Sequence, residues 1–447
     1  MSKRQERLFL ERDDVLSWGR VVRQKQYVAH PNFRDELPRL IAAPERESKL
    51  ATGLRRSYGD SCLNGAGAII DLTGLDRFIL FDAQTGSLRA EAGVSLSAVL
   101  QLVVPYGWFL PTTPGTRFVT LGGAVSNDVH GKNHHHAGSF GVHVVAIGLL
   151  RSDGRRLILG PDNEQNLFRA TIGGLGLTGV IEWVELQLAP IQSAYLDVEI
   201  LPYESLDAFW PLAEESVVVS EHTVAWVDCM SRGISAGRGV FTRANWADDG
   251  CFDAHSDRTF KNVPLDFPGF ALNRLSVGTF NEAYYHLHRL KKKKVRQHYS
   301  TYFYPLDSIL NWNRLYGFGG MMQYQCVIPP ENAKDAMRVL LIEISKSGQA
   351  SFLAVMKTFG GRASPGLLSF PRPGATLTLD FSNRGDVTLA LMSRLDAIVR
   401  DARGALYPAK DGRMPAEMFK LSFPHWESLA ALKDPGISSD FWRRVSQ

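Results

Sequence analysis

Residues 111–144 read PTTPGTRFVTLGGAVSNDVHGKNHHHAGSFGVHV, and this glycine-rich segment carries the strongest indication of the fold. Glycine has no Cβ, so the backbone around Gly115, Gly122 and Gly123 can approach a ligand closely. No glycine-rich segment opens a helix after a first strand, as a Rossmann fingerprint does, and GxxxxGK[ST] is absent. The stretch therefore predicts a ligand held by glycine-rich loops without either common nucleotide fingerprint.

Two further glycine-rich segments lie on either side of this stretch. Residues 51–75 read ATGLRRSYGDSCLNGAGAIIDLTGL, where Arg56 and the loop backbone offer a cation and N–H groups to a pyrophosphate. An ordinary turn explains that segment equally well when it is taken alone. Residues 171–186 read TIGGLGLTGVIEWVEL and place four glycines before a β-type run. The three segments in this order are much more specific than any one of them.

In this order the segments resemble the FAD-binding domain of the vanillyl-alcohol-oxidase, or PCMH-type, superfamily, over roughly the first 190 residues. A closer resemblance spans nearly the whole chain. It is similar to the decaprenylphosphoryl-β-D-ribose 2′-oxidases and their homologues in the strings RRSYGD, TPGTR, HGKNHHHAGSFG, GGLGLTG, YPLDSILNWNRLYG, QYQCVIP, SFLAVMKTFG, LSFPRPG and LYPAKDGR.

This resemblance implies a function as well as a fold. It implies an FAD-dependent enzyme that oxidises the ribose C2 hydroxyl of a polyprenyl-phosphate-linked sugar to a ketone. A short-chain reductase partner would then complete epimerisation to arabinose for a cell-envelope glycan or glycolipid. An aldonolactone or soluble-sugar oxidase of the same superfamily, and more remotely a flavin-free binding protein, are the alternatives. The electron acceptor, a quinone or dioxygen, stays open.

The expected fold class is α+β, with two domains around a shared cleft. Short strands are predicted near residues 68–75, 87–93 and 155–160, and a helix at 95–104, where apolar residues share one face. After residue 189 glycines thin out and aromatic residues increase. Helices predicted at 332–347 and 386–403 would lie on one face of an antiparallel sheet. The resemblance implies an FAD domain at 1–190, a substrate domain at 191–404 and a C-terminal return to the FAD domain at 405–447.

Composition narrows the class of protein further. The 447 residues are 45% hydrophobic and 21% charged, which is typical of a folded globular protein. Four scattered cysteines form no CxxC pair, so neither a zinc ribbon nor a dithiol redox motif is expected. The charged opening MSKRQERLFLERDD has no apolar signal core, and no apolar run approaches ~18 residues. We expect a cytoplasmic protein, with a peripheral position at the inner membrane as the alternative.

A basic run, RLKKKKVRQ, spans residues 289–297. A solvated surface turn and a contact with anionic lipid or a phosphate headgroup are both open interpretations. Nucleic acid is not expected, because the net charge is only +4 and no aromatic-interleaved basic groove accompanies the run.

The resemblance carries the FAD contacts onto particular positions of this chain. They are Gly53, Arg56, Ser57, Tyr58, Gly59, Pro114, Gly115, Thr116, Gly122, Gly123, Ser126, Asn127, His130, Lys132, Asn133, Gly174, Gly176, Gly179, Val180 and Tyr407. Arg56 stands where covalently flavinylated relatives have a histidine, so the flavin is expected to be noncovalent. Arg55 replaces a usual glycine, which would strain the loop if that position needs a positive φ.

The resemblance also implies the catalytic and substrate-binding residues. The catalytic ones are His130, Lys357 and Lys410, and either His130 or Lys410 could be the base. The substrate-binding ones are Phe303, Gln323, Gln325, Lys357, Thr376, Thr378 and Lys410. Phe303, Thr376 and Thr378 stand where tyrosine, asparagine and cysteine are usual, so the sugar or its carrier is expected to differ.

A metal site is the competing hypothesis for the histidines of VHGKNHHH. Adjacent histidines cannot all face one ion, no HExxH is present and no acidic ligand is interleaved, so no metal is expected.

Overall fold

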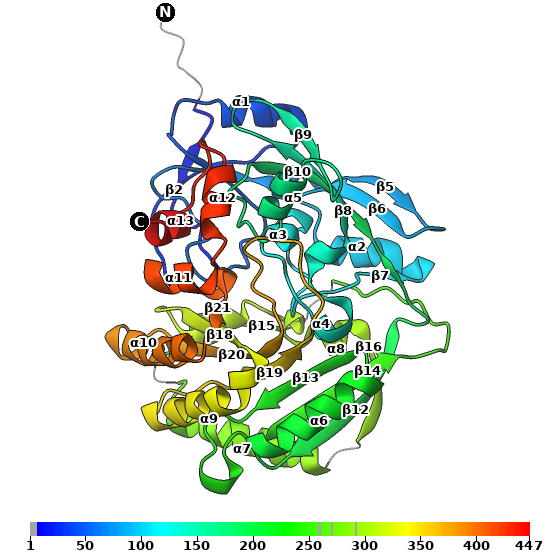
Figure 1. The fold of residues 1–447 in the computed structure, drawn as a ribbon, viewed down its shortest axis with the longest axis vertical. Coiled ribbons are helices and arrows are strands. Elements are labelled where there is room, and N and C mark those ends of the chain that lie inside the picture. The colour runs from blue at the N-terminus through cyan, green and yellow to red at the C-terminus, as the bar shows by residue number, and fades with distance from the viewer. Residues whose placement is uncertain (1–6, 258–260, 270, 291–292) are drawn as a thin grey trace, which may run out of the picture.

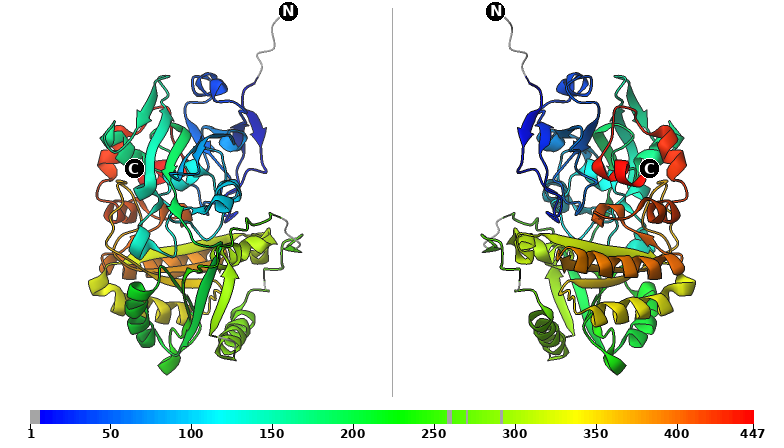
Figure 2. Two further views of the ribbon diagram at one scale, coloured as in Figure 1. Left: turned by 90° about the vertical axis from the view of Figure 1, so that its right-hand side faces the viewer. Right: turned by 90° about the vertical axis from the view of Figure 1, so that its left-hand side faces the viewer.

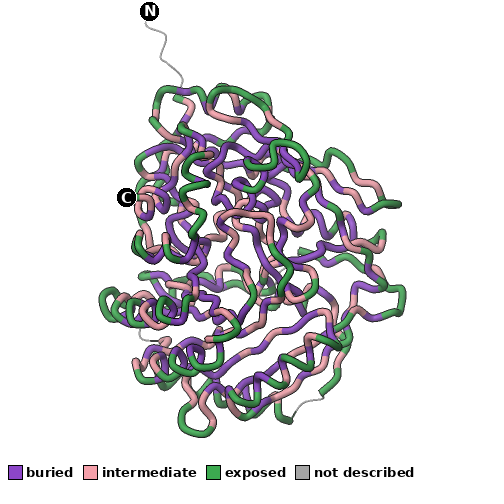
Figure 3. The backbone as a smooth tube through the Cα atoms, viewed as in Figure 1, coloured by how far each residue is buried: buried purple, intermediate pink, exposed green. Residues whose placement is uncertain are grey.

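The computed structural model of the chain describes residues 7–257, 261–269, 271–290 and 293–447. Of the basic run at 289–297, Lys291 and Lys292 lie outside the described residues. Figure 1 shows two stacked halves: the N-terminal and C-terminal segments share one half, and the middle of the chain forms the other. Buried positions run through the sheets of both halves, and exposed positions lie on the outer helices (Figure 3). This architecture confirms the predicted α+β class.

The first half holds two sheets. The smaller has the order β1-β2-β4-β3 and consists of β1 (Leu10–Arg12), β2 (Gln26–Ala29), β4 (Ala68–Asp71) and β3 (Lys49–Thr52). Strands β2, β4 and β3 are parallel, and β4 is buried at every position, as a parallel strand covered on both faces should be. The larger sheet is antiparallel with the order β5 (Phe78–Asp82), β6 (Ser87–Glu91), β10 (Val180–Gln187), β8 (Val144–Leu150) and β9 (Arg156–Leu159).

Short helices connect these strands. They are α1 (Leu37–Ile41), α2 (Leu96–Val103), α3 (Leu121–Ser126), α4 (His134–Ala137) and α5 (Gln165–Thr171). Helix α2 confirms the helix predicted at 95–104. Its Ser95 side chain accepts a hydrogen bond from the Ala98 N–H at 3.1 Å, which caps the first turn. A two-stranded pair, β7 (Trp108–Phe109) with β11 (Ala189–Pro190), lies beside these elements.

The second half is built on one sheet with the order β16-β12-β14-β13-β19-β20-β18-β21. Its strands are β16 (Lys294–His298), β12 (Tyr195–Tyr203), β14 (Gly239–Trp246), β13 (His222–Val227), β19 (Ala354–Phe359), β20 (Gly374–Ser382), β18 (Met321–Ile328) and β21 (Ala405–Leu406). Smaller elements nearby are α8 (Tyr299–Phe303), β15 (Lys261–Asn262) and β17 (Ile309–Leu310).

Four longer helices accompany this sheet: α6 (Leu206–Val219), α7 (Arg274–Leu290), α9 (Pro330–Ser347) and α10 (Asp386–Asp401). Helices α6, α9 and α10 cover the face turned away from the first half (Figures 1 and 2). Helix α9 ends at Gly348, which has a φ of 71°. Helix α10 ends two residues earlier than the predicted Arg403, which has a left-handed φ of 56°.

The C-terminal segment crosses between the two halves. Strand β21 pairs with β18 in the large sheet, and η8 (Pro408–Lys410) follows it directly. Helices α11 (Ala416–Ser422), α12 (Trp426–Leu432) and α13 (Asp440–Val445) come next. The Arg444 guanidinium of α13 binds the Asp60 carboxylate at 2.7 Å, which ties this segment to the first glycine-rich loop. Lys410 is thereby held where the halves meet.

Candidate active site between the two halves

A cavity of about 670 Å³ is lined by residues of both halves. Its volume lies within the roughly 300–1,000 Å³ usual for small-molecule and cofactor sites. One end is made by the three glycine-rich segments, and the other by strands of the large sheet together with α7. No helix among the described residues is long and apolar enough to cross a membrane.

The loop at residues 53–57 forms the first wall. Arg55 has a φ of 50°, so the position does require a left-handed backbone, and arginine adopts it at a cost in strain. Arg55 Nη1 forms an ion pair with Asp71 Oδ2 at 2.6 Å, which fixes the side chain on the protein's own carboxylate. No described group accepts a hydrogen bond from the backbone N–H groups of residues 54–57. They are available to an anionic group.

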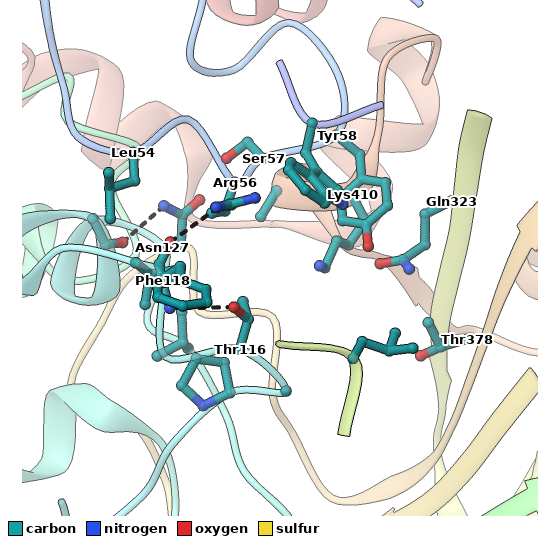
Figure 4. A pocket seen from close by; sticks show the side chains of 18 of the residues that line it. Leu54, Arg56, Ser57, Tyr58, Thr116, Phe118, Asn127, Gln323, Thr378 and Lys410 are labelled. Atoms are coloured by element: carbon teal, nitrogen blue, oxygen red, sulfur yellow. Dashed lines mark hydrogen bonds between the residues drawn. The ribbon is translucent and has the colours of Figure 1, made fainter. Parts of the chain in front are cut away.

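Arg56 brings a partly buried cation to the same wall. Its Nε donates to the Phe118 carbonyl at 3.1 Å (Figure 4). Its guanidinium carbon lies 4.0 Å from the centre of the Trp18 ring. Burial lowers the pKa of Arg56, and an anion beside it would relieve that cost. The arrangement suits a pyrophosphate.

The second and third glycine-rich segments complete the cradle. A Cβ added to Gly115 would meet no atom within 4 Å. Gly176 has a φ of 74°, and a Cβ added there would lie 3.9 Å from the nearest atom, the Ala51 carbonyl oxygen. Both glycines line the cavity. The Asn127 amide nitrogen donates to the Gly123 carbonyl at 2.8 Å, while its buried Oδ1 has no partner among the described residues. Free backbone donors, a partly buried cation, an unpartnered acceptor and open glycine surfaces fit bound FAD.

Some residues expected at the ligand lie behind the wall. Of the expected cofactor-binding and substrate-binding positions, those that do not line the cavity are Gly59, Asn133, Gly174, Val180 and Thr376. A Cβ on Gly59 would lie 1.8 Å from the Asp411 carbonyl oxygen, so this glycine permits close packing of the C-terminal segment. Thr376 is fully buried, and its hydroxyl accepts a hydrogen bond from Gln325 at 3.3 Å. These residues support the lining residues rather than face the ligand.

Three lysines line the middle of the cavity: Lys132, Lys357 and Lys410. Burial and the charge of Lys357 lower the pKa of Lys132 to about 7. Burial and the charge of Lys410 lower the pKa of Lys357 to about 8. Burial also lowers the pKa of Lys410 to about 8, and the Asp380 carboxylate opposes that shift. Such perturbed lysines in one cleft are typical of a site that binds anions or transfers protons.

His130 lies between Gln325 and Lys357. Its Nε2 lies 3.0 Å from Gln325 Nε2, and its Nδ1 lies 3.4 Å from Lys357 Nζ. Burial and the neighbouring lysine charges hold the pKa of His130 well below its usual value, so the imidazole is neutral near pH 7. Both neighbours carry N–H donors, so the single acceptor nitrogen of the neutral imidazole is already engaged by one of them and is not free to take the proton of a substrate hydroxyl.

Lys410 differs from His130 in this respect. Its ammonium lies 4.2 Å from the centre of the Tyr58 ring and has no hydrogen-bond acceptor among the described residues. Figure 4 shows Lys410 beside Tyr58, with Gln323 and Thr378 nearby. Lys410 is therefore free to contact a ligand.

Asp380 is a cavity residue that the sequence analysis missed. It accepts a hydrogen bond from the Gln323 amide, which lies opposite it in the β18–β20 register, and burial raises its pKa to about 6. Alternation along β20 could have revealed it, because Thr378 and Asp380 point to the same face. Its carboxylate brings a negative charge to the wall that holds Lys410.

The far end of the cavity is apolar and was also missed. Its aromatic wall consists of Trp226, Phe280, Tyr284 and Phe352. The Trp226 and Tyr284 ring centres are 4.7 Å apart, and those of Phe280 and Phe352 are 5.8 Å apart. These residues come from β13, α7 and a loop, so no local pattern joins them. Phe303 lines the cavity too, with its ring 4.9 Å from that of His222.

Metal binding finds no geometric support among the described residues. They contain no group of three or more His, Cys, Asp or Glu side chains arranged to hold an ion. The His134 ring is buried with both nitrogens unpartnered, and burial lowers its pKa to about 4.

Comparison with known proteins identifies the family. The FAD binding domain family matches residues 26–160. Decaprenylphosphoryl-β-D-ribose oxidase of Mycolicibacterium smegmatis is 35% identical, over 96% of this chain and 97% of that protein. The chain belongs to the decaprenylphosphoryl-β-D-ribose oxidase family. It is an FAD-dependent oxidoreductase that acts on a hydroxyl group.

Two other relatives place the chain more broadly. An uncharacterized protein of Streptomyces coelicolor, from the mprA 5′ region, is 32% identical over 79% of this chain and all of that protein. A D-arabinono-1,4-lactone oxidase of Yarrowia lipolytica is 22% identical over 35% of this chain and 30% of its own length. The FAD match removes the interpretation as a flavin-free binding protein.

The flavin should be released by acid or heat. Arg56 occupies the loop position where a covalent attachment would need a nucleophile, and a guanidinium cannot serve as one. Precipitated protein should be colourless, with flavin absorbance near ~450 nm in the supernatant. Yellow colour that stays with the washed pellet would contradict noncovalent binding.

Proposed function

We propose that this enzyme oxidises the C2 hydroxyl of ribose in a polyprenyl-phosphate-linked sugar to a ketone, the first half of an epimerisation that feeds cell-envelope arabinosylation. The observation that carries the proposal is 35% identity to the M. smegmatis enzyme over 96% of the chain, which includes the whole large sheet. The lactone oxidase match covers only 35% of the chain, so the aldonolactone alternative has less support. A short-chain reductase would reduce the ketone, and a peripheral membrane contact would give access to the lipid-linked substrate.

The lysines that line the cavity orient the substrate. Lys132 and Lys357 can hold the sugar phosphate, because burial strengthens their attraction for an anion. Gln323 and Gln325 line the cavity from neighbouring positions on one face of β18 and can hydrogen-bond sugar hydroxyls. Bound FAD would supply the hydride acceptor.

We infer that Lys410 is the general base that removes the proton of the reacting hydroxyl. A general base must be deprotonated when it acts and must reach the hydroxyl directly or through one water. Lys410 suits this role, since its amine has no described acceptor and burial lowers its pKa to about 8, which gives the deprotonated form a share of the population near neutral pH. His130 instead keeps its two partners and positions Lys357 and Gln325.

The function is tested by anaerobic bleaching of the flavin. Polyprenylphosphoryl ribose in detergent should bleach the enzyme, whereas the matched arabinose compound should not, because it differs only at C2. L-Gulono-1,4-lactone and free ribose are tested as alternative, soluble substrates in the same bleaching assay. Bleaching by the lactone at a higher rate than by the lipid-linked sugar would overturn the proposed substrate.

A further inference from the structure

Helix α7 presents apolar side chains to solvent. Leu275, Leu287 and Leu290 are 80%, 50% and 87% exposed, and their helical spacing places all three on one side of the helix. The opposite side buries Val277, Asn281 and Tyr285 against the domain. Exposed leucines concentrated on one helix face mark a contact surface more often than isolated ones do.

The same helix forms part of the cavity. Phe280, Tyr284 and His288 line the aromatic end, and Phe280 is also partly open to solvent. One flank of α7 therefore faces the substrate cavity while the leucines face outward. The helix lies in the second half of the molecule, on the side away from β1 (Figures 1 and 2).

Positive charge accompanies the exposed leucines. Arg289 and Lys293 are exposed and form no ion pair among the described residues. Glu282, the acidic residue on this part of α7, is already paired with Arg238. A leucine face bordered by unpaired cations is complementary to the acyl and headgroup layers of an anionic bilayer.

We propose that the Leu275–Leu287–Leu290 face of α7 docks on an anionic lipid bilayer, which places the aromatic end of the cavity at the membrane. The proposal rests on the proposed function in one respect: a polyprenyl chain resides in the bilayer and must reach this end of the cavity. Docking leaves the lipid chain in or near the membrane while the sugar enters toward Lys357 and Lys410.

Vesicle flotation of the holoenzyme tests this surface without any substrate. The wild type should float with vesicles that contain phosphatidylglycerol and much less with pure phosphatidylcholine, and added salt should weaken binding. The variant L275Q/L287Q/L290Q should partition at least ~10-fold less. A matched control, L10Q/L80Q/I158Q, changes exposed residues of β1, β5 and β9 in the other half and should bind as the wild type does.

Retained flavin absorbance in each variant shows that the fold survives. Equal flotation of the α7 variant and the wild type would overturn the proposal, as would equal binding to neutral vesicles. A concentration-dependent dimer that the α7 variant abolishes, without vesicle binding, would assign the face to a second copy of the chain. Failure of the lipid-linked sugar to bleach an enzyme that still binds vesicles would contradict the proposed function and leave the docking surface intact.

Discussion

Replacing Lys410 with methionine will slow anaerobic bleaching of the flavin by substrate by at least ~100-fold, the usual lower contribution of a general base. Methionine fills nearly the volume of the lysine stem, so packing against Tyr58 should survive. FAD content should stay close to that of the wild type, because the cation at the proposed pyrophosphate wall is Arg56. Stopped-flow absorbance measures the rate and the cofactor content together.

The pH dependence of bleaching separates two roles of Lys410. Burial lowers its pKa to about 8, so the neutral amine gains population as the pH rises through 8. If the amine takes the proton, the wild-type rate should rise between about pH 7 and pH 9, and the methionine variant should lose this dependence. A rate that falls over the same range in the wild type but not in the methionine variant would show that the Lys410 ammonium charge is required instead, because Lys132 and Lys357 also titrate in this range in both proteins.

Lys410→Arg supplies the matched control. Arginine keeps a positive charge but stays protonated at every accessible pH, so it cannot act as a base. We expect this variant to remain as slow as the methionine variant. Recovery of most of the rate with arginine would assign Lys410 an electrostatic role. Lys334→Met, a change on the surface of α9, should leave the rate unchanged.

The glycine-rich loops could be predicted from sequence because their residues are contiguous. Gly115 was predicted to contact the cofactor because it lacks a side chain, and Arg56 because it carries a positive charge, and each lies in a recognisable sequence motif. Asp380 and the Trp226–Phe352 aromatic wall could not be found in this way, because register and tertiary packing bring them together. The extent of α10 shows the same limit: one left-handed residue, Arg403, stopped a helix whose apolar spacing predicted two more positions.

Sequence strings also could not distinguish lining residues from supporting ones. Gly59 and Gly115 lie in similar glycine-rich segments, yet a Cβ would collide with the Asp411 backbone at the first and enter open space at the second. Thr376 and Thr378 are two residues apart on one strand, and only Thr378 reaches the cavity. Such differences depend on the backbone of a distant segment.

Changing Gly115 to leucine should therefore weaken FAD binding at least ~10-fold, within the ~1–3 kcal/mol that overpacking costs. The glycine lines the proposed cofactor cradle, its φ is not in the left-handed region, and an added Cβ meets no protein atom within 4 Å. The free protein should consequently fold normally, while the side chain occupies space that the cofactor needs.

Gly361→Leu is the control for that change, since Gly361 also has open space around its Cβ position but does not line the cavity. Flavin-to-protein ratio, FAD titration of the stripped protein and circular dichroism of both variants make the comparison. Normal FAD affinity in Gly115→Leu would show that the cofactor leaves this part of the wall empty. If only Gly115→Leu loses secondary structure, Gly115 is required for folding of the chain and not specifically for FAD binding.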